Sequence, residues 1–374
     1  MKIPLSEPDI NNAEIEEVVS VLRSSRLSLG PKMEEFEASI STYVGQPFGI
    51  AVSSGTAGLH LCIRALGIGP GDEVIVPSFT FIAAANAIRY EGATPIFVDI
   101  DPVTLNLNPA CVEDAVTART RAIVIVHTFG VPAEVDALLD IAKRHHLKVI
   151  EDACEALGAE YGTRRAGSFG DAAVFAFYPN KQITTGEGGM VVTRDPLLAS
   201  AIRAMRNQGR YDSDAGHQHS ILGWNYRLSE INCALGCAQM RRIESILTIR
   251  KAVACTYDKA LQGMNVVERP LLKLPHRQIS WFVYVIRLAP RFSRENRDSI
   301  VGNLIKHDIG CGRYFAPIHT QPAYSKFRIR HLLPVTESIS ARTIALPFFN
   351  LLDETRILHV TKLLEEAIRS ISAA

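Results

Sequence analysis

The chain alternates two kinds of segment from residue 48 to residue 195, and this alternation constrains its fold more than any other feature. Short runs rich in β-branched and other apolar residues are separated by segments of helix length or by glycine-rich turns. Such alternation is typical of a mostly parallel sheet covered by helices. We therefore expect an α/β fold with a seven-stranded sheet. Its strands are expected at residues 49–52, 73–76, 95–99, 122–127, 148–152, 172–177 and 189–193.

The pattern changes on both sides of this region. Residues 11–24 have the periodicity of an amphipathic helix, and residues 228–261 have that of one long helix or two joined helices. Farther along, we expect a strand at residues 281–286 and a closing helix at residues 351–370. The sequence therefore predicts a large α/β domain and a smaller α+β domain. Their expected ranges are 1–245 and 246–374.

Charge and composition exclude several classes of protein. The chain of 374 residues carries 40 Lys and Arg against 39 Asp and Glu, which removes the electrostatic reason to expect nucleic acid or an anionic membrane as a partner. Its longest aliphatic run, residues 122–126, is far shorter than the about 18 to 20 apolar residues that cross a bilayer. The N-terminus lacks the apolar stretch of a secretory signal. Seven cysteines, an odd number without a C-x-x-C pair, favour reduced thiols, so we expect a cytoplasmic protein.

One lysine stands between an expected strand and a glycine-rich turn. Lys181 follows the apolar strand end and Pro179, and residues 184–189 then read Thr-Thr-Gly-Glu-Gly-Gly. A solvated lysine in an ordinary turn explains this pattern about as well as a functional one does. In a confined pocket, however, a lysine can lose its proton and form a Schiff base with an aldehyde.

A second feature lies where the first strand passes into a helix. Residues 52–58 read Val-Ser-Ser-Gly-Thr-Ala-Gly, and small residues at a helix N-terminus let free backbone amides approach an anion such as phosphate. The alternative is a plain N-cap, for which Ser and Thr are preferred. The segment lacks the Gly-Lys-Ser/Thr ending of a Walker loop.

Two further residues follow strand ends. Asp152 ends a strand that reads as continuous apolar sequence, at the sheet edge where ligands bind in open α/β folds. It fits either an N-cap or a buried carboxylate that pairs with a protonated heterocyclic nitrogen. Phe81 leaves another strand end, where it fits either the core or the face of a planar ring.

These signals are weak singly and specific together. A phosphate site, a stacking aromatic, a carboxylate for a ring nitrogen and a lysine occur in one α/β region. Pyridoxal 5'-phosphate (PLP) requires one such partner for its phosphate, its ring face, its pyridine nitrogen and its aldehyde. The set therefore indicates PLP as the cofactor.

With these residues in hand, the sequence closely resembles the DegT-type family of nucleotide-sugar aminotransferases, which have the PLP-dependent transferase fold type I. The resemblance covers nearly the whole chain. It is carried most specifically by the segments 54–57 (Ser-Gly-Thr-Ala), 77–81 (Pro-Ser-Phe-Thr-Phe), 151–153 (Glu-Asp-Ala), 179–181 (Pro-Asn-Lys), 185–189, 225–227 (Asn-Tyr-Arg) and 314–319 (Tyr-Phe-Ala-Pro-Ile-His).

The resemblance implies roles for individual residues. Lys181 and Asp152 are the implied catalytic pair, as the lysine that binds PLP covalently and the partner of its pyridine nitrogen. The phosphate loop falls on Ser54, Gly55 and Thr56, and Phe81 falls where the family places an aromatic over the ring.

The resemblance also implies contacts beyond one chain's cofactor. Asn225 falls where relatives reach the phosphate of the neighbouring subunit's cofactor, which implies a homodimer with shared active sites. Tyr314 and His319 lie in the family's segment near the sugar nucleotide. Arg313 is placed to meet a diphosphate, although an ordinary surface charge is an equal reading.

Two positions depart from the family pattern. Ala176 stands where many relatives have a serine that contacts the phosphate, so one phosphate contact is missing or comes from elsewhere. Glu155 stands where many have Gln or His close to the ring hydroxyl, so we treat Glu155 as a candidate cofactor-binding residue.

The expected function is transfer of an amino group from L-glutamate to a nucleotide-linked keto sugar, an NDP-4-keto-6-deoxyhexose or an NDP-3-keto sugar. The nucleotide (dTDP, UDP or GDP) and the aminated carbon stay open. Alternatives are a sugar dehydratase, for which the family resemblance leads us to expect histidine in place of Lys181, an aminotransferase for a cyclic ketone without a nucleotide, and a regulatory relative without catalysis.

A metal site is a weaker alternative. Asp212, Asp214, His217 and His219 lie close together in the sequence, and His-x-His can bind zinc. The Gly, Ser and Gln residues around them favour a polar loop, so we expect no metal.

Overall fold

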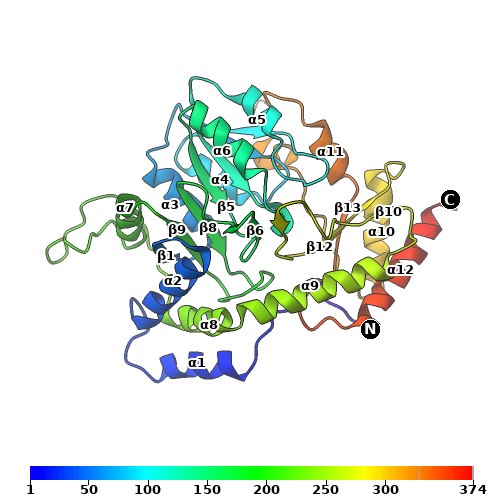
Figure 1. Cartoon of the computed structure of the whole chain (residues 1–374), viewed down its shortest axis with the longest axis horizontal. Helices are drawn as coiled ribbons and strands as arrows, with labels where there is room; N and C mark the ends of the chain where they lie inside the picture. The colour runs from blue at the N-terminus through cyan, green and yellow to red at the C-terminus, as the bar shows by residue number, and fades with distance from the viewer. Residues whose placement is uncertain (328, 373–374) are drawn as a thin grey trace.

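A mixed seven-stranded sheet forms the centre of the protein, described by a computed structural model that covers residues 1–327 and 329–372 (Figure 1). The strands lie in the order β1-β9-β8-β5-β4-β2-β3, and only β9 runs antiparallel to its neighbours. The expected α/β fold with a mostly parallel seven-stranded sheet is therefore confirmed. The strands are β1 (Phe48–Val52), β2 (Glu73–Pro77), β3 (Thr94–Val98), β4 (Thr120–Val126), β5 (Lys148–Asp152), β8 (Ala172–Ala176) and β9 (Gly189–Thr193).

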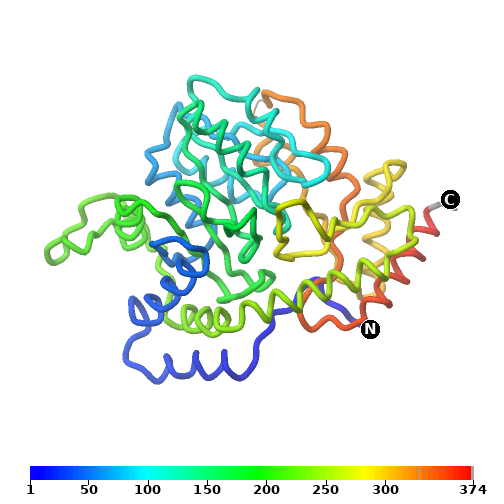
Figure 2. The backbone as a smooth tube through the Cα atoms, viewed as in Figure 1, coloured from blue at the N-terminus to red at the C-terminus, as the bar shows by residue number. Residues whose placement is uncertain are grey.

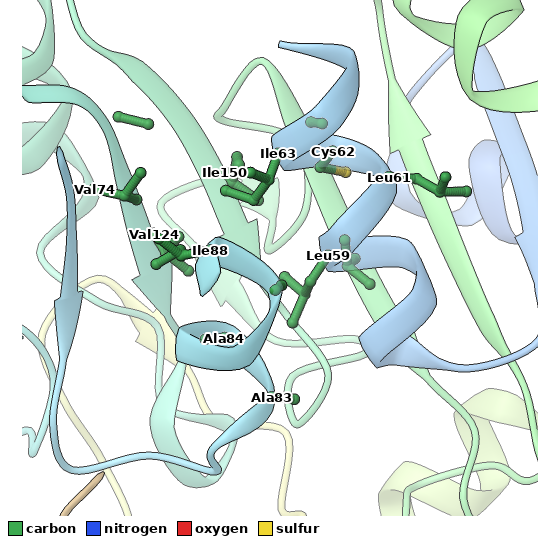
Figure 3. Close-up of a cluster of buried hydrophobic side chains, with 14 of the residues drawn as sticks. Leu59, Leu61, Cys62, Ile63, Val74, Ala83, Ala84, Ile88, Val124 and Ile150 are labelled. Carbon is green, nitrogen blue, oxygen red and sulfur yellow. The ribbon is translucent and has the colours of Figure 1, made fainter. Parts of the chain in front are cut away.

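Helices cover both faces of this sheet. Alternate residues of a strand point to opposite faces, so Val74 packs with one helix layer and Ile75 with the other. Figure 3 shows Leu59 and Ile63 of one helix beside Ile88 of the next, with Val124 and Ile150 of the sheet in the same cluster. The first layer contains α3 (Gly55–Ala65), α4 (Ala83–Tyr90) and α7 (Pro196–Arg206); the second contains α2 (Pro31–Val44), α5 (Pro109–Ala115), α6 (Val135–Arg144) and α8 (Glu230–Arg241).

The expected long helix at residues 228–261 is two joined helices. Helix α8 ends at Arg241 and α9 (Ile243–Ala260) begins two residues later, because Arg242 leaves helical geometry between them. Helix α1 (Asn12–Leu22) packs against α8 and lies beside it in Figure 1. A capping box at Asn11 and Glu14 fixes its first turn.

The C-terminal part has its own apolar cluster. It combines residues of α9, of the sheet β10-β12-β13 and of the helices that follow. Ile3 belongs to the same cluster, and its backbone amide donates to the carbonyl of Asp308 at 2.9 Å, so the N-terminal segment lies against this part (Figure 2). The elements are β10 (Val267–Glu268), β12 (Tyr284–Leu288), α10 (Arg294–Lys306), α11 (Pro334–Ser340), β13 (Thr343–Leu346) and α12 (Glu354–Ser372).

Short elements complete the chain. A small sheet in the order β11-β6-β7 links residues far apart in the sequence. No helix among residues 1–327 and 329–372 is long and apolar enough to cross a bilayer. The short elements are β6 (Glu160–Tyr161), β7 (Arg164–Arg165), β11 (Arg277–Gln278), η1 (Thr128–Gly130), η2 (Ile318–Thr320) and η3 (Pro322–Tyr324).

The boundary expected between residues 245 and 246 falls inside α9. Ile243 and Ile246 belong to a cluster of the large sheet, whereas Val253 and Tyr257 belong to the C-terminal cluster. One helix therefore contributes to both cores. The division into two domains stays a prediction.

The strand expected at residues 281–286 begins later, at Tyr284. The reason is a buried arginine of α9. Arg250 donates from Nε to the carbonyl of Trp281 at 2.6 Å and from an Nη atom to the carbonyl of Phe282 at 2.7 Å. These carbonyls are used by a side chain instead of a neighbouring strand.

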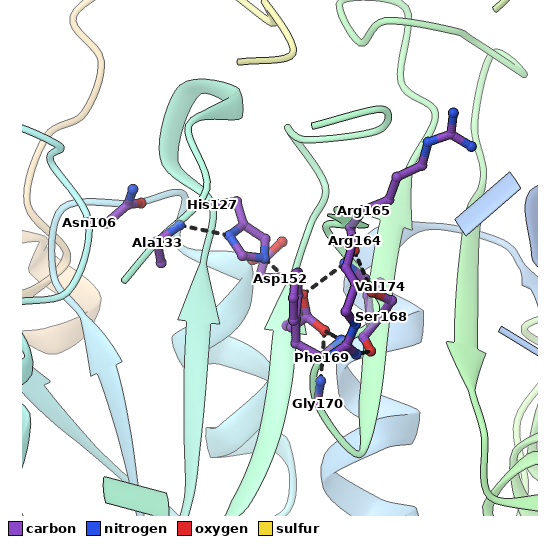
Figure 4. A network of polar contacts seen from close by, with 12 residues as sticks. Asn106, His127, Ala133, Asp152, Arg164, Arg165, Ser168, Phe169, Gly170 and Val174 are labelled. Carbon is purple, nitrogen blue, oxygen red and sulfur yellow. Dashed lines mark hydrogen bonds and ion pairs between the residues drawn. The ribbon is translucent and has the colours of Figure 1, made fainter. Parts of the chain in front are cut away.

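A buried carboxylate fastens the loop before β8 to the centre of the sheet. Glu151 in β5 accepts backbone hydrogen bonds from Gly167, Phe169 and Gly170 at 2.7 to 2.8 Å. Its fourth partner is Nε2 of His127 at 2.9 Å. Figure 4 shows the ring of His127 between Ala133 and the strand that ends at Asp152. The amide of Ala133 donates to Nδ1 at 3.1 Å. Because Nδ1 accepts, the ring hydrogen lies on Nε2 and donates to Glu151.

We predict that Glu151→Gln destabilises the protein in a pH-dependent way. Burial alone raises the pKa of Glu151, but the hydrogen bonds from His127 and the loop amides outweigh it and hold the pKa below the usual 4.5. The charged carboxylate thus stabilises the folded state above about pH 4.5, and this contribution is lost as the pH falls through the lower folded-state pKa. At neutral pH the variant should lose about 3 kcal/mol of unfolding free energy, as measured by urea denaturation.

The matched control is Glu366→Gln, which changes an exposed carboxylate 3.9 Å from Lys362 and should alter stability by less than about 0.5 kcal/mol. The difference between wild type and Glu151→Gln should shrink in acid. A difference that stays constant through the acidic range would contradict this account.

Candidate active site

A cavity of about 740 Å³ opens at the carboxyl edge of the sheet. Because the carboxyl ends of parallel strands meet at one edge, residues far apart in the sequence converge there. The cavity is lined from β5, from the turn after β8, from the start of α3 and from the C-terminal segment 313–321. Of the residues expected in the site, those at its wall are Ser54, Gly55, Thr56, Phe81, Asp152, Glu155, Lys181, Arg313 and Tyr314.

The start of α3 presents backbone amides to the cavity. Ser54 is the N-cap, and its side chain accepts from the amide of Ala57 at 3.0 Å. Within the part of the chain that the structure describes, the amides of Gly55 and Thr56 have no hydrogen-bond acceptor. Two free amides at the positive end of a helix fit a phosphate group.

Glycine is required at position 55 by the space around it. A Cβ atom there would lie 2.8 Å from Cβ of Ala176 and 2.9 Å from Sγ of Cys154. Any larger residue would push α3 away from β8 and from the loop after β5. Ala176 itself lies in the cavity wall without a hydroxyl, so β8 offers no hydrogen bond to a phosphate from this position.

Asp152 ends β5 with its side chain at the cavity, and the residue is only 7% exposed. Oδ1 accepts from the amide of Cys154 at 3.2 Å. A carboxylate this buried needs a positively charged partner. The position therefore fits a protonated ring nitrogen.

Lys181 reaches the cavity from the turn after β8. Its backbone amide donates to the carbonyl of Tyr178 at 2.9 Å, which closes the turn, and its side chain is only 13% exposed. The Nζ atom lies 3.8 Å from Oε1 of Glu155. The lysine amine thus stands in a confined site, and a lysine in such a site can form a Schiff base with an aldehyde.

Glu155 is a buried residue of the cavity wall. Its Oε2 atom accepts from the backbone amide of Phe129 at 2.8 Å. Burial raises the pKa of Glu155 to about 6, although Lys181 and the Phe129 amide favour the charged form. Glu155 can therefore change its protonation in response to what binds beside it.

Phe81 and Tyr178 form part of the outer wall. Both side chains line the cavity, yet Phe81 is 60% exposed and Tyr178 is 53% exposed. The amides of α3, the ring of Phe81, Asp152 and Lys181 together offer a partner to each group of PLP. The residues present therefore fit this cofactor.

Of the four residues predicted to contact the substrate or the neighbouring subunit, two line the cavity and two lie outside it. Tyr314 and Arg313 line the cavity, and Nε of Arg313 also donates to Oδ1 of Asp298 at 2.6 Å. His319 is not among the lining residues. It is buried between Ser78, whose Oγ lies 2.7 Å from Nδ1, and Glu337, whose Oε1 lies 3.2 Å from Nε2.

Asn225 also lies outside this cavity and is exposed. The role predicted for Asn225 is in a neighbouring subunit's site, and the roles of Asn225 and His319 stay predictions.

The four residues considered for a metal lie in the loop between α7 and α8. Asp214 accepts from the amide of Tyr211 at 2.8 Å and from Ser220 at 2.7 Å, so its carboxylate folds the loop. Among the described residues, no group of three or more His, Cys, Asp or Glu side chains is placed to hold a metal ion.

Sequence reasoning missed several residues of the wall. Asn180, between Pro179 and the lysine, lines the cavity with a buried Oδ1 atom that has no partner among the described residues. Phe282 reaches the wall from the segment before β12. Asn180 could have been predicted as a site residue because it directly precedes Lys181 in the sequence. Phe282 gave no such signal, because it lies in an apolar run that is typical of a buried strand.

A lysine, a buried carboxylate and a helix N-terminus around one cavity define a PLP-dependent enzyme with an α/β fold. The chain belongs to the DegT/DnrJ/EryC1/StrS aminotransferase family, whose model matches residues 8–365. This membership confirms the expected fold type, the cofactor and the activity of a PLP-dependent sugar aminotransferase. The lysine at position 181 argues against the dehydratase alternative, for which histidine is expected there.

Relatives cover the chain almost completely. GDP-perosamine synthase of Caulobacter vibrioides is 39% identical over 369 residues, which are 98% of each chain. The structure of DesV from S. venezuelae, in complex with a ketimine intermediate, is 36% identical with a TM-score of 0.89 and 98% coverage of both chains. Helicobacter pylori PseC, an aminotransferase involved in the biosynthesis of pseudoaminic acid, has a TM-score of 0.94 at 27% identity and covers 99% of this chain and all of its own.

Proposed function

We propose that the protein transfers the amino group of L-glutamate to a keto sugar linked to a nucleoside diphosphate. The observation that carries this proposal is one cavity shared by Lys181, Asp152 and the outer residues Arg313 and Tyr314. The inner residues serve the cofactor and the outer ones leave room for a large, anionic substrate. The name of the 39% identical relative, GDP-perosamine synthase, favours a GDP-linked keto sugar.

Bound PLP supplies an aldehyde that takes up the amino group and a ring that withdraws electrons from the substrate carbon. When PLP is bound, the amides of Gly55 and Thr56 would hold its phosphate. Asp152 would keep its ring nitrogen protonated, and Phe81 would cover a ring face. Without the charge of Asp152 the ring would attract electrons more weakly.

Lys181 is the group that moves the proton. Its Nζ atom would take a proton from the α-carbon of the amino donor, hold it as an ammonium and deliver it to the C4' carbon of the cofactor. Glu155, 3.8 Å away, stabilises that ammonium. The same residues serve the reverse steps on the keto sugar.

The substrate is tested by incubating the purified enzyme with PLP, ¹⁵N-labelled L-glutamate and a panel of ketones. We expect one of the GDP-, dTDP- or UDP-linked keto sugars to gain a ¹⁵N-labelled amine, detected by NMR, with release of an equal amount of 2-oxoglutarate. The position of the new C–N bond identifies the aminated carbon.

The panel of ketones also contains an inosose. In a parallel series of reactions, each ketone is incubated with the enzyme and PLP but without glutamate. Amination of the inosose alone would contradict the nucleotide-sugar proposal and support the cyclic-ketone alternative. Loss of a sugar hydroxyl without consumption of glutamate would support a dehydratase.

We further propose a homodimer with shared active sites in the cytoplasm. The exposed Phe81 and Tyr178 at the cavity wall and the exposed Asn225 outside it support a second subunit that covers this surface. All seven cysteines are free, which supports a reducing compartment.

Mixed dimers test the sharing of sites. Lys181→Ala and Asn225→Ala should each be nearly inactive. If Asn225 serves the neighbouring subunit, a mixed dimer has one intact site and one doubly impaired site. Equal mixing after mild dissociation should then restore about one quarter of wild-type activity, because about half of the dimers are mixed.

Homodimers of each variant, dissociated and reassociated alone, are the control. Mixtures with no more activity than the two controls would contradict shared sites.

A further inference from the structure

The ammonium of Lys181 has a second neighbour besides Glu155. Its Nζ atom lies 4.0 Å from the centre of the Phe282 ring, over the ring face. The face of an aromatic ring is negative and attracts cations, most strongly where water is excluded. Phe282 is 2% exposed and the side chain of Lys181 is 13% exposed, so little of the contact is open to water.

The backbone holds Phe282 in this position. Arg250 binds the carbonyls of Trp281 and Phe282 from α9, as described above. On the other side, Gln182 donates from Nε2 to Oγ of Ser280 at 3.0 Å. Gln182 follows Lys181, and Ser280 precedes Phe282 by two residues. This hydrogen bond therefore fixes the segment that carries the lysine relative to the segment that carries the ring.

Glu155 is held just as firmly. Its Oε2 atom is occupied by the amide of Phe129, which leaves Oε1 toward Lys181. The ammonium is thus placed between one carboxylate oxygen and one ring face. Further titratable groups at the cavity are Asp152 and Cys154 on the β5 side, Tyr178 and Glu187 on the segments around the lysine turn, and Arg313 and Tyr314 on the C-terminal segment.

We propose that Phe282 is a positioning residue that, together with Glu155, holds the ammonium of Lys181 whenever the lysine is not bound to the cofactor. This inference rests on the proposed role of Lys181 in moving the proton. A lysine side chain has many rotamers, and a fixed resting place keeps its amine near the reacting atoms. Loss of the ring should make the ammonium less stable and the amine less ordered.

The test measures the protonation of Lys181 in the full-length enzyme loaded with pyridoxamine 5'-phosphate, in which the lysine amine is free. Brief pulses of acetic anhydride at a series of pH values label neutral amines, and mass spectrometry quantifies the peptide that contains Lys181. Lys362, whose side chain is 73% exposed, is the internal reference. The labelling midpoint is the pH at which half of Lys181 is labelled. Phe282→Leu should lower this midpoint by about one pH unit, because the ring no longer stabilises the ammonium.

Two variants separate the ring from packing. Phe282→Tyr keeps the ring and should keep the wild-type midpoint. Phe292→Leu makes the same change at a buried site in the C-terminal cluster, outside the cavity, and should also leave the midpoint unchanged. If Phe282→Leu does not fold, as judged by circular dichroism, Phe282→Met removes the ring while filling similar space.

An unchanged midpoint in the ring-free variant would overturn the proposal, as would an equal shift in Phe282→Tyr. The labelling requires no turnover, so this result is independent of the substrate. A failed ketone panel would instead reject the proposed function and leave the role of Phe282 standing.

Discussion

The site depends on one topological constraint, the meeting of parallel strand ends at a single sheet edge. Strands β5 and β8 lie side by side, so Asp152 at the end of one comes close to the turn that carries Lys181 after the other. Helix α3, which starts just after β1, points its free amides at the same edge. Glu151 fastens the loop that leads into β8 and thereby fixes the register on which this meeting depends.

The charged groups that fit the cofactor are concentrated in one cavity and do not reflect the net charge of the chain. The chain is nearly neutral, with 40 basic and 39 acidic residues, yet the site combines a buried carboxylate, a lysine and a helix N-terminus in one cavity. Each of these groups would be costly if buried alone. The C-terminal segment contributes as well, since Phe282 and Tyr314 close the cavity from that side.

Much of this arrangement was predictable because the signals are local. Strand ends, the glycine-rich turn and the small residues before α3 placed Lys181, Asp152 and Gly55 at one edge without any knowledge of tertiary contacts. Phe282 and His319 were not predictable in the same way. Phe282 faces the lysine because Arg250, distant in the sequence, binds its carbonyl, and His319 is turned away from the cavity by Ser78 and Glu337.

The central claim is that PLP is bound covalently at Lys181, opposite Asp152. Reduction of the enzyme with sodium borohydride converts the link between lysine and cofactor into a stable amine, which peptide mapping by mass spectrometry can locate. The account predicts the cofactor's added mass on the peptide that contains Lys181, and nowhere else. Cofactor on another lysine, or on no peptide of the PLP-loaded enzyme, would contradict it.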